Sequence, residues 1–243
     1  MQSDRMTPGG WVAIHVAGTP LSILAGPPPD AVVTERTVVV CSPTSAALVL
    51  GSTQEAADFD PARCAAAGLD ILRRRSGGGA VLLRPGAQVW IDVFVPRGDP
   101  LFDDDVLASF GWLGAIWAGA VADSLGPSAG AGAGARLEVV RGPVAATAWS
   151  RTLCFGGLGA GEVTLDDRKV VGISQRRARP GAWFHSMALL EFDPPELISL
   201  LDRSEPERDE AAAWLAGFAT SVPAGRTAAE ELISSVLSRL PSA

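Results

Sequence analysis

RRRSGGGAV, residues 73–81, places three consecutive glycines between two runs of β-forming residues. Because Gly77, Gly78 and Gly79 lack a Cβ atom, a ligand can lie directly against their backbone, with peptide N–H groups directed at an oxyanion or a carbonyl. The preceding arginines, 73–75, could each give a phosphate two hydrogen bonds. The commoner role of such a segment is an exposed hairpin loop, and the lysine of a phosphate-binding P-loop is missing here.

A second segment, DRKVVGISQ at residues 167–175, contains Lys169, the single lysine among the 20 basic side chains of the chain. Lysine presents a compact point charge on a flexible stem, which the planar guanidinium of arginine does not. A lone lysine in an arginine-rich chain therefore indicates a specific use for the ammonium, although chance alone could also leave one lysine.

The hydrophobic pattern predicts an α+β domain in which a mixed, largely antiparallel sheet is packed by helices. Strand-like runs bounded by Gly, Pro or Asp occur at residues 11–16, 37–41, 47–51, 69–73, 80–83, 89–95 and 183–192. Helices are expected at residues 62–67, 103–125, 194–201, 209–218 and 227–240.

Two local patterns make sharper predictions. Residues 162–175 predict a β-hairpin that turns at Asp166-Asp167. Strict alternation along its second strand predicts one face that carries Lys169, Val171, Ile173 and Gln175. The acidic triplet at 103–105 is expected to begin the longest helix at the positive end of its dipole, Gly126-Pro127 to end it, and 128–135 to form a loop.

Bulk composition excludes several classes of partner and site. The chain has a net charge of −7 and 47% hydrophobic residues, so neither nucleic acid nor an anionic membrane is an expected partner. Cys41, Cys64 and Cys154 form no CxxC pair, and only His15 and His185 could add imidazole ligands, so no metal site is predicted. Sparse cysteines and the absence of a signal-peptide pattern predict a cytoplasmic protein.

In this order along the chain, the two segments resemble the paired signature of the lipoate–protein ligases and related octanoyltransferases, RRxSGGGAV followed by [D/G]RKxxGxxQ. The resemblance extends from Ala47 to Phe192, and it includes LVLGSTQ at 48–54 and the histidine of FHS, His185. It implies the α+β catalytic domain of the biotin/lipoate protein ligases over residues 1–205, followed by a short helical extension over residues 206–243.

The resemblance implies an enzyme that attaches lipoate or octanoate to a lysine of a carrier protein through an acyl-adenylate, with ATP and Mg²⁺ as co-substrate. The carrier would be a lipoyl-carrier domain or a glycine-cleavage-type protein. The family's catalytic lysine corresponds to Lys169, whose ammonium would stabilise charge on the carboxylate, the α-phosphate and the oxyanion. Residues expected to bind substrate or adenylate are Arg73, Arg74, Ser76, Gly77, Gly78, Gly79, Ala80, Gly172, Gln175 and His185.

The resemblance also suggests where the acyl chain and the carrier bind. Val171 and Ile173, beside Lys169, could line a tunnel for the acyl chain, since each buried CH₂ contributes about 0.8 kcal/mol. They could equally be ordinary core residues. A local basic cluster is expected to dock an acidic carrier, and it consists of Arg168, Lys169, Arg176, Arg177 and Arg179.

Two alternatives stay open. Cys154, in LCFGG, stands where cysteine-dependent octanoyltransferases of this superfamily carry a nucleophile, so an ATP-independent transferase would use Cys154 together with Lys169. A small apolar cysteine in a β-core is the other role for this residue. LLRPG at 82–86 replaces a polar His-Asp pair that the family usually carries, and only residues 203–243 follow Asp202. A catalytically silent protein that binds an acyl group or an acyl-adenylate is therefore the second alternative.

Overall fold

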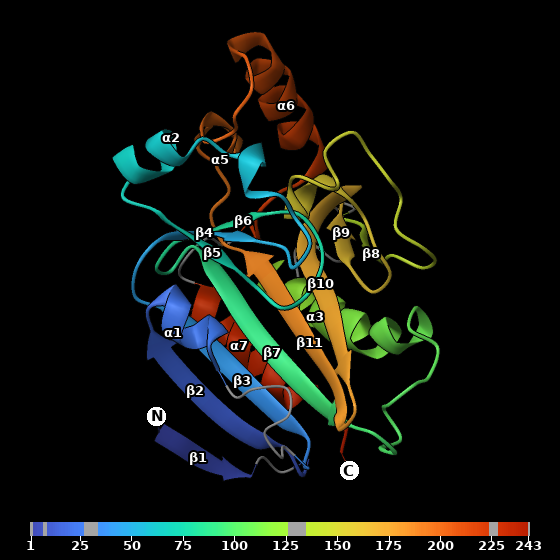
Figure 1. Cartoon of the computed structure of the whole chain (residues 1–243). Coiled ribbons are helices and arrows are strands. Elements are labelled where there is room, and N and C mark those ends of the chain that lie inside the picture. The colour runs from blue at the N-terminus through green and yellow to red at the C-terminus, as the bar shows by residue number, and fades with distance from the viewer. Residues whose placement is uncertain (1, 7–8, 27–33, 126–134, 224–227, 243) are drawn as a thin grey trace.

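The computed structural model describes residues 2–6, 9–26, 34–125, 135–223 and 228–242, with side chains from Gly9 onward. These residues form a large eight-stranded sheet in the order β1-β2-β3-β7-β11-β10-β9-β8 and a small sheet in the order β5-β4-β6 (Figure 1). The strands of the large sheet are β1 (Gln2–Met6), β2 (Val12–Gly18), β3 (Thr37–Pro43), β7 (Gln88–Pro96), β8 (Leu137–Val139), β9 (Val163–Leu165), β10 (Arg168–Ala178) and β11 (Gly181–Leu189). Those of the small sheet are β4 (Ala47–Leu50), β5 (Asp70–Arg73) and β6 (Val81–Leu83).

Within the described strands, β2 pairs parallel with β3 and β4 pairs parallel with β5, whereas the other pairs are antiparallel. The prediction of a mixed, largely antiparallel sheet is therefore confirmed. The apolar run ALVLG forms β4, which lies in the centre of the small sheet between β5 and β6.

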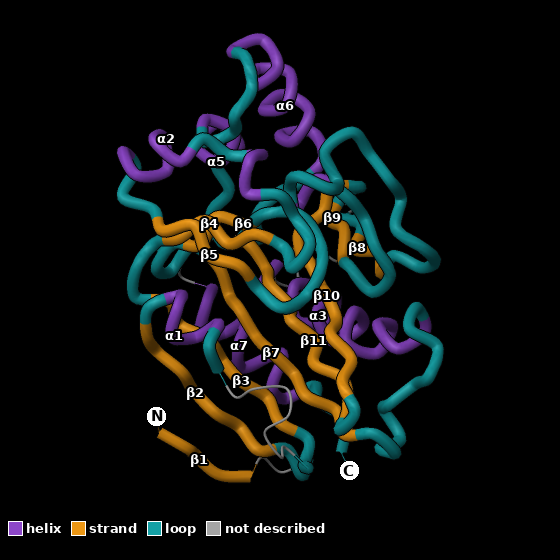
Figure 2. The backbone as a smooth tube through the Cα atoms, viewed as in Figure 1, coloured by secondary structure: helices purple, strands orange, loops and turns teal. Residues whose placement is uncertain are grey.

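Helices α3 and α7 cover one face of the large sheet, α1 packs on the other face, and the remaining helices lie at one end of the molecule. Figure 2 shows α3 and α7 behind the large sheet, whereas α2, α5 and α6 gather beyond the small sheet. The helices are α1 (Pro20–Leu24), α2 (Pro61–Ala66), α3 (Gly111–Leu125), α5 (Pro194–Ser199), α6 (Glu205–Phe218) and α7 (Ala229–Ser238), with 3₁₀ turns η1 (Ala56–Asp58), η2 (Ala108–Phe110) and η3 (Cys154–Gly156). Among the helices described, none has both the length and the hydropathy that a membrane crossing requires.

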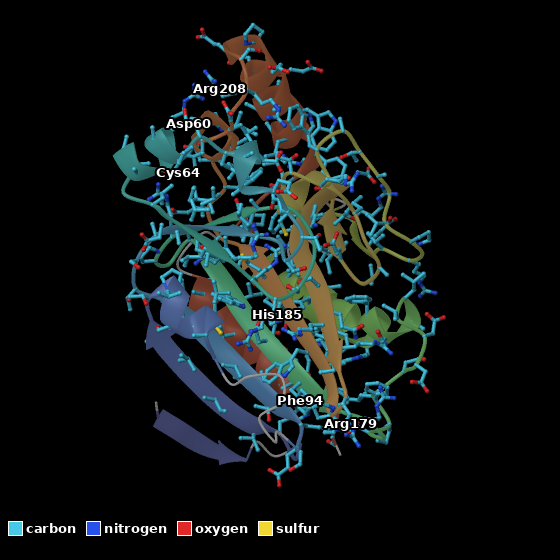
Figure 3. The ribbon with its side chains drawn as sticks, in the orientation of Figure 1. Asp60, Cys64, Phe94, Arg179, His185 and Arg208 are labelled. Carbon is cyan, nitrogen blue, oxygen red and sulfur yellow. The ribbon has the colours of Figure 1, made fainter. Side chains whose placement is uncertain are left out.

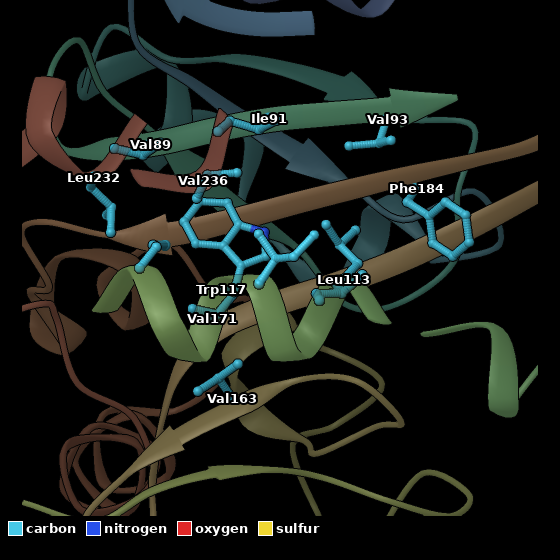
Figure 4. Packing of buried hydrophobic residues seen from close by; sticks show 14 of the residues in the cluster. Val89, Ile91, Val93, Leu113, Trp117, Val163, Val171, Phe184, Leu232 and Val236 are labelled. Atoms are coloured by element: carbon cyan, nitrogen blue, oxygen red, sulfur yellow. The ribbon is translucent and has the colours of Figure 1, made fainter. Parts of the chain in front are cut away.

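The main core lies between the large sheet and the pair α3 and α7. Figure 4 shows Trp117 and Leu113 of α3 packed toward Val89, Ile91 and Val93 of β7, with Val236 of α7 beside them. Trp117 and Leu113 have no exposed surface, and burial of side chains of this size stabilises a fold by about 1.5–3 kcal/mol each. The opposite face of the large sheet packs against α1 and the small sheet.

The local signals for turns and caps are confirmed where they can be checked. Oδ1 of Asp60 accepts hydrogen bonds from the N–H groups of Ala62 and Arg63 at 2.8 and 3.3 Å, which caps α2. Asp166 and Asp167 adopt φ angles of 49° and 65° in the β9–β10 turn, the left-handed conformation that a two-residue hairpin requires. Gly126-Pro127, residues 128–134 and the expected helix start at 227 lie outside the described residues.

The predicted start of the longest helix at Asp103 is wrong, because α3 begins at Gly111. The acidic side chains form turns instead. Oδ1 of Asp105 accepts from the N–H groups of Leu107 and Ala108 at 2.8 and 3.2 Å, and Oδ1 of Asp103 accepts from the N–H of Asp105 at 2.8 Å. Aspartate side chains that bond nearby backbone in this way compete with helix formation.

The C-terminal helices pack on both cores. Leu232 and Val236 of α7 belong to the core under the large sheet, and Ala211 and Leu215 of α6 belong to a second core around the small sheet. The boundary expected near residue 205 stays a prediction. The segment after α6 also contacts β10, since the N–H of Thr220 donates to the carbonyl of Lys169 at 2.8 Å.

Candidate active site

Lys169 has a buried side chain, with 1% of its surface exposed. Its ammonium donates to Oε1 of Glu162 at 2.7 Å, to the carbonyl of Cys154 at 2.8 Å and to the carbonyl of Gly157 at 2.9 Å. The ammonium also lies 5.1 Å from the ring centroid of Phe155. A protonated amine has three N–H donors, so this site provides an acceptor for each of them.

A β-bulge breaks the alternation predicted for this strand. The register between β9 and β10 shifts between Lys169 and Val171, so that Lys169 shares a side with Gly172: a Cβ added at Gly172 would lie 3.5 Å from Cε of Lys169. Val171 instead packs in the main core (Figure 4). The expectation that Val171 lines an acyl tunnel is therefore wrong, whereas Ile173 does line the cavity around Lys169. Bulges often re-aim a side chain in this manner.

Glu162, just before β9, is a site residue that the sequence did not reveal. Its Oε2 accepts from the N–H of Gly159 at 2.8 Å, and its Oε1 accepts from the N–H of Ile173 at 3.3 Å as well as from Lys169. Burial raises the pKa of this carboxyl, although Lys169 and the two backbone donors act to lower it. Only the tertiary pairing of residue 162 with Lys169 distinguishes Glu162 from an ordinary residue at a strand start.

The triglycine loop is joined to the segment that precedes η3. The N–H of Ala80 donates to the carbonyl of Thr152, and the N–H of Cys154 donates to the carbonyl of Ala80, both at 2.8 Å. A Cβ added at Gly79 would lie 2.5 Å from the backbone of Leu153, whereas one added at Gly77 would meet nothing within 4 Å. Gly79 is therefore required for this close approach, and Gly77 faces open space.

The two arginines expected to bind phosphate hold the loops of the site together. Arg74 donates to the carbonyls of Gly77 and Gly79 at 2.7 and 2.8 Å, and Arg73 donates to the carbonyls of Gly51 and Gln54 at 2.8 and 2.6 Å. Arginine has several donors, and these contacts join the triglycine loop and the 51–54 turn to the end of β5, where Arg73 is the last residue and Arg74 follows it. The role of Arg73 and Arg74 in substrate binding stays a prediction.

Cys154 lies in η3 beside both parts of the site. Its backbone N–H bonds to Ala80, its carbonyl bonds to Lys169, and its partly exposed side chain lines the same cavity as Lys169. Burial raises the pKa of the thiols of Cys41 and Cys64, with nearby Asp92 and Asp60 as smaller contributions. Of the three thiols, that of Cys154 is the one that borders the cavity of Lys169.

His185 and Asp92 form a pair on neighbouring strands. Nδ1 of His185 on β11 lies 2.9 Å from Oδ2 of Asp92 on β7, and Nε1 of Trp90 donates to Oδ1 of Asp92 at 2.7 Å. His185 projects from the middle of the large sheet (Figure 3). A carboxylate on Nδ1 holds the imidazole in one orientation. Asp92 is the only charged residue of β7. Nothing else in the sequence marked it as a candidate site residue.

A cavity of about 280 Å³ brings most of the predicted site residues together. Its lining includes Arg74, Gly77, Gly78, Gly79, Cys154, Glu162, Lys169, Gly172, Ile173, Gln175 and His185. Arg73, Ser76 and Ala80 are not among the lining residues. Ser76 is buried behind the loop, where its hydroxyl accepts from Ser174 at 3.0 Å.

A second cavity of about 660 Å³ adjoins the first, because Leu24, Arg74, Trp90 and His185 line both. Its other walls are mainly apolar residues of β2, β3 and β11, among them Val12, Ile14, Val16, Val39 and Trp183. Within the described residues, no group of three or more His, Cys, Asp or Glu side chains could hold a metal ion.

The expected basic cluster is divided by the fold. Lys169 is buried in its ion pair and is not part of a surface patch. Arg177, near the far end of β10, donates to the carbonyls of Asp103 and Asp104 at 2.6 and 3.1 Å. Figure 3 shows Arg179 at that same far end, away from the small sheet.

Comparison with known proteins identifies the fold and the family. The family model described as the lipoyl protein ligase A/B catalytic domain matches residues 31–223. The octanoyltransferase LipM of Clostridioides difficile (strain 630) is 26% identical over 174 residues, which cover 69% of this chain and 58% of that protein. The match thus spans less than two thirds of the relative's length.

Two solved structures share the fold. The bipartite lipoate protein ligase of Thermoplasma acidophilum, described with its E2 lipoyl domain, has a TM-score of 0.66 at 18% identity and covers 93% of this chain and 80% of its own. A lipoate-protein ligase A bound with ATP has a TM-score of 0.60 at 18% identity and covers 96% of this chain and 84% of its own. The expected lipoate ligase fold is confirmed, and with the family model matching most of its length, the chain belongs to the lipoyl protein ligase A/B catalytic domain family.

Proposed function

We propose that this chain is an acyltransferase that moves an octanoyl or lipoyl group onto a lysine of a carrier protein. One observation supports this function above the others: the Lys169 ammonium, the triglycine backbone and the Cys154 thiol line a single cavity. Acyl transfer passes through a tetrahedral oxyanion, and a fixed ammonium with nearby backbone N–H groups stabilises such an anion. The substrate class comes from the family, whose members handle lipoyl groups.

The adjoining apolar cavity is the proposed location of the acyl chain. Its volume of about 660 Å³ lies within the range usual for small-molecule sites. Valine, isoleucine and tryptophan side chains form an apolar part of its wall, and charged residues such as Arg75 and Asp92 form another part. Each CH₂ buried there would contribute about 0.8 kcal/mol to binding. Since the two cavities share Leu24 and His185, a chain in the second cavity can place its carboxyl end near Lys169.

Of the two routes we favour the one that uses Cys154 as the nucleophile, because Cys154 lines the cavity of Lys169. The Cys154 thiolate would attack the thioester carbonyl of a donor carrier, which forms an acyl-Cys154 thioester and releases the donor thiol. The amine of the acceptor lysine would then attack this thioester, which forms an amide and returns the Cys154 thiol. The matching relative from C. difficile is named an octanoyltransferase, which supports this assignment.

The adenylate route expected from the sequence is the second candidate. Its support is the open space at Gly77, where a nucleotide could lie against backbone, and the shared fold with a ligase that binds ATP. Arg73 and Arg74 fit this role less well, because their guanidinium groups already bond to loop carbonyls. The acceptor in either route would be a lipoyl-type carrier domain, since the archaeal ligase of similar fold is described together with its E2 lipoyl domain.

Intact-mass spectrometry separates the two routes. The chain is incubated with an octanoyl-carrier thioester, or with octanoate, ATP and Mg²⁺, and then with an acceptor carrier domain. An acyl-thioester mass that forms without ATP and maps to Cys154 supports the favoured route. Pyrophosphate release that requires both ATP and octanoate supports the adenylate route.

Matched variants sharpen this test. Cys154→Ala should abolish the thioester and the transfer, whereas Cys64→Ala, at a buried thiol outside the cavity, should leave both intact. Tight octanoate binding without acylation of the chain or of a carrier would contradict the proposal and identify a binding protein.

A further inference from the structure

We propose that Glu162 is a positioning residue that keeps Lys169 charged and fixed in the cavity before the substrate arrives. Its catalytic consequence rests on the proposed acyl transfer, whereas its structural content concerns the ion pair alone. Glu162 is the single carboxylate among the described residues that line the cavity of Lys169. Its carboxylate oxygen lies 2.7 Å from the Lys169 ammonium.

The contacts around Lys169 make this carboxylate the decisive acceptor. Of the three acceptors of the ammonium, the carbonyls of Cys154 and Gly157 are neutral and only Glu162 can carry a negative charge. With 1% of the Lys169 surface exposed, bulk water contributes little to stabilising its charge. A buried ammonium without a counter-ion tends to lose its proton.

Glu162 is itself held by the fold and cannot follow the lysine. Both oxygens accept backbone N–H groups, from Gly159 and Ile173. Helix α3 lies directly against the preceding residue, because a Cβ added at Gly114 would clash with the carbonyl of Gly161. A charge held by packed secondary structure gives the preorganisation that a catalytic site requires.

The same contacts indicate which bond the substrate replaces. Because all three donors of Lys169 are used, an incoming oxyanion must displace one acceptor or share its hydrogen. The carbonyls of Cys154 and Gly157 form part of η3 and the loop between η3 and β9, whereas Glu162 is held at both oxygens. We therefore expect a carbonyl to yield its place while the ion pair persists.

The other basic side chains around the cavity are already engaged. Arg74 bonds to the loop carbonyls and His185 pairs with Asp92. Burial raises the pKa of Glu162 although Lys169 and two backbone N–H groups act to lower it.

The single lysine of the chain permits a direct test by NMR. Uniform ¹³C-lysine labelling gives one ε-methylene signal, that of Lys169, which is followed as a function of pH in the parent chain, in Glu162→Gln and in Asp99→Asn. The parent signal should show an acidic step when Glu162 becomes protonated, and Glu162→Gln should lack that step. The alkaline step of Lys169 should move to lower pH in Glu162→Gln by about one to three units, the usual effect of removing an adjacent opposite charge.

Asp99→Asn is the matched control, because it neutralises the other largely buried ion pair, Arg36–Asp99, outside the cavity. It should leave both steps of the Lys169 signal unchanged. An identical alkaline step in the parent and in Glu162→Gln overturns the proposal, and so does a parent signal with no acidic step. The parent measurement decides the matter even if Glu162→Gln fails to fold.

Activity provides the second readout. In Glu162→Gln the alkaline limb of the pH–kcat profile should move to lower pH by the same amount as the NMR step, with KM little changed, whereas Asp99→Asn should keep the parent profile. A lower kcat without a shifted limb would show a merely structural role and overturn the proposal. If no acyl transfer occurs in any chain, the proposed function fails, and the NMR titration still tests the ion pair.

Discussion

Two largely buried ion pairs, Arg36–Asp99 and Lys169–Glu162, differ in their acceptors and in their surroundings. Arg36 donates from Nε and Nη2 to both oxygens of Asp99 at 2.7 and 2.9 Å, and from Nη1 to the carbonyls of Pro241 and Ser242. Lys169 directs its ammonium at one oxygen of Glu162 and at two carbonyls that border a cavity. The first pair joins the start of β3 to the turn after β7 and to residues 241–242, whereas the second joins two strands beside open space.

The pKa shifts of the two carboxyls differ in sign. Burial raises the pKa of Asp99, but hydrogen bonds from Arg36 and from the N–H of Leu101 outweigh it and the net pKa is lowered. For Glu162 burial prevails and the pKa is raised. The bidentate contact of Arg36 favours the ionised form of Asp99 and so stabilises the fold. In the Lys169–Glu162 pair, burial opposes the ionised form of the carboxyl.

The largest expected effect is on transfer in Lys169→Arg, which keeps the charge but cannot fit a compact ammonium among three acceptors. We expect the rate to fall by about 10²- to 10³-fold, the usual loss when one oxyanion donor is removed. Steady-state transfer to a carrier domain measures it, with Arg36→Lys as the matched substitution outside the cavity. A parent-like rate in Lys169→Arg would show that the site is assigned to the wrong residue.

Asp99→Asn should lower the stability of the fold and leave acyl transfer unchanged. Removing one partner of a largely buried pair leaves Arg36 without its counter-ion, so we expect the free energy of unfolding to decrease by about 3 kcal/mol. Urea denaturation monitored by tryptophan fluorescence measures this change, and transfer per folded molecule should stay at the parent level. Stability equal to that of the parent would mean that this pair does not hold the fold.

Gly79→Ala should displace the Cys154 carbonyl, which accepts a hydrogen bond from Lys169. The added Cβ would lie 2.5 Å from the backbone of Leu153, so the neighbouring Cys154 carbonyl must move, and overpacking of this kind costs about 1–3 kcal/mol. We expect a lower denaturation midpoint and slower transfer. Gly77→Ala, whose Cβ would meet nothing within 4 Å, should keep the midpoint, and equal destabilisation of both variants would contradict the close approach.

The smallest effect is the pH dependence of stability, which should have opposite signs for the two pairs. The folded pKa of Asp99 is lowered, so its contribution is present above the ordinary aspartate value and is lost as pH falls through the folded value. The pKa of Glu162 is raised in the folded state. Its contribution to the free energy of unfolding is therefore present below the ordinary pKa of glutamate and is lost as the pH rises through the folded-state pKa. Urea midpoints of Asp99→Asn and Glu162→Gln, measured against the parent over about pH 3 to 8, a range that spans the ordinary carboxyl values, should therefore diverge in opposite directions.

Local chemistry explains which parts of the fold could be predicted from the sequence. Asp60 before Pro61 caps α2 and Asp166-Asp167 turns the hairpin, because both effects depend on a few adjacent residues. The start of α3 was mispredicted for a related reason, since the acidic triplet bonds its own backbone and forms turns. An aspartate side chain can cap a helix or form a turn with its own backbone. The residues next to it in the sequence do not decide between these two structures.

The sequence motifs mark some of the residues that line the cavity, and the fold adds others that no motif marks. The triglycine loop and Lys169 line one cavity, as the paired motifs suggested. Glu162 and Asp92 lie outside those motifs, and only the strand register brings them to Lys169 and His185. The bulge after Lys169 also removes Val171 from the cavity, which strict alternation could not anticipate.

The burial of Lys169 has a consequence for any chain that handles activated acyl groups. An acyl thioester or mixed anhydride reacts readily with free amines, and in this sequence the lone ε-amine is enclosed and bonded to three acceptors, while the other basic side chains are arginines and two histidines. A protonated amine is not a nucleophile. If the chain carries out the proposed transfer, its own lysine is therefore shielded from the acyl group, which is left for the acceptor amine.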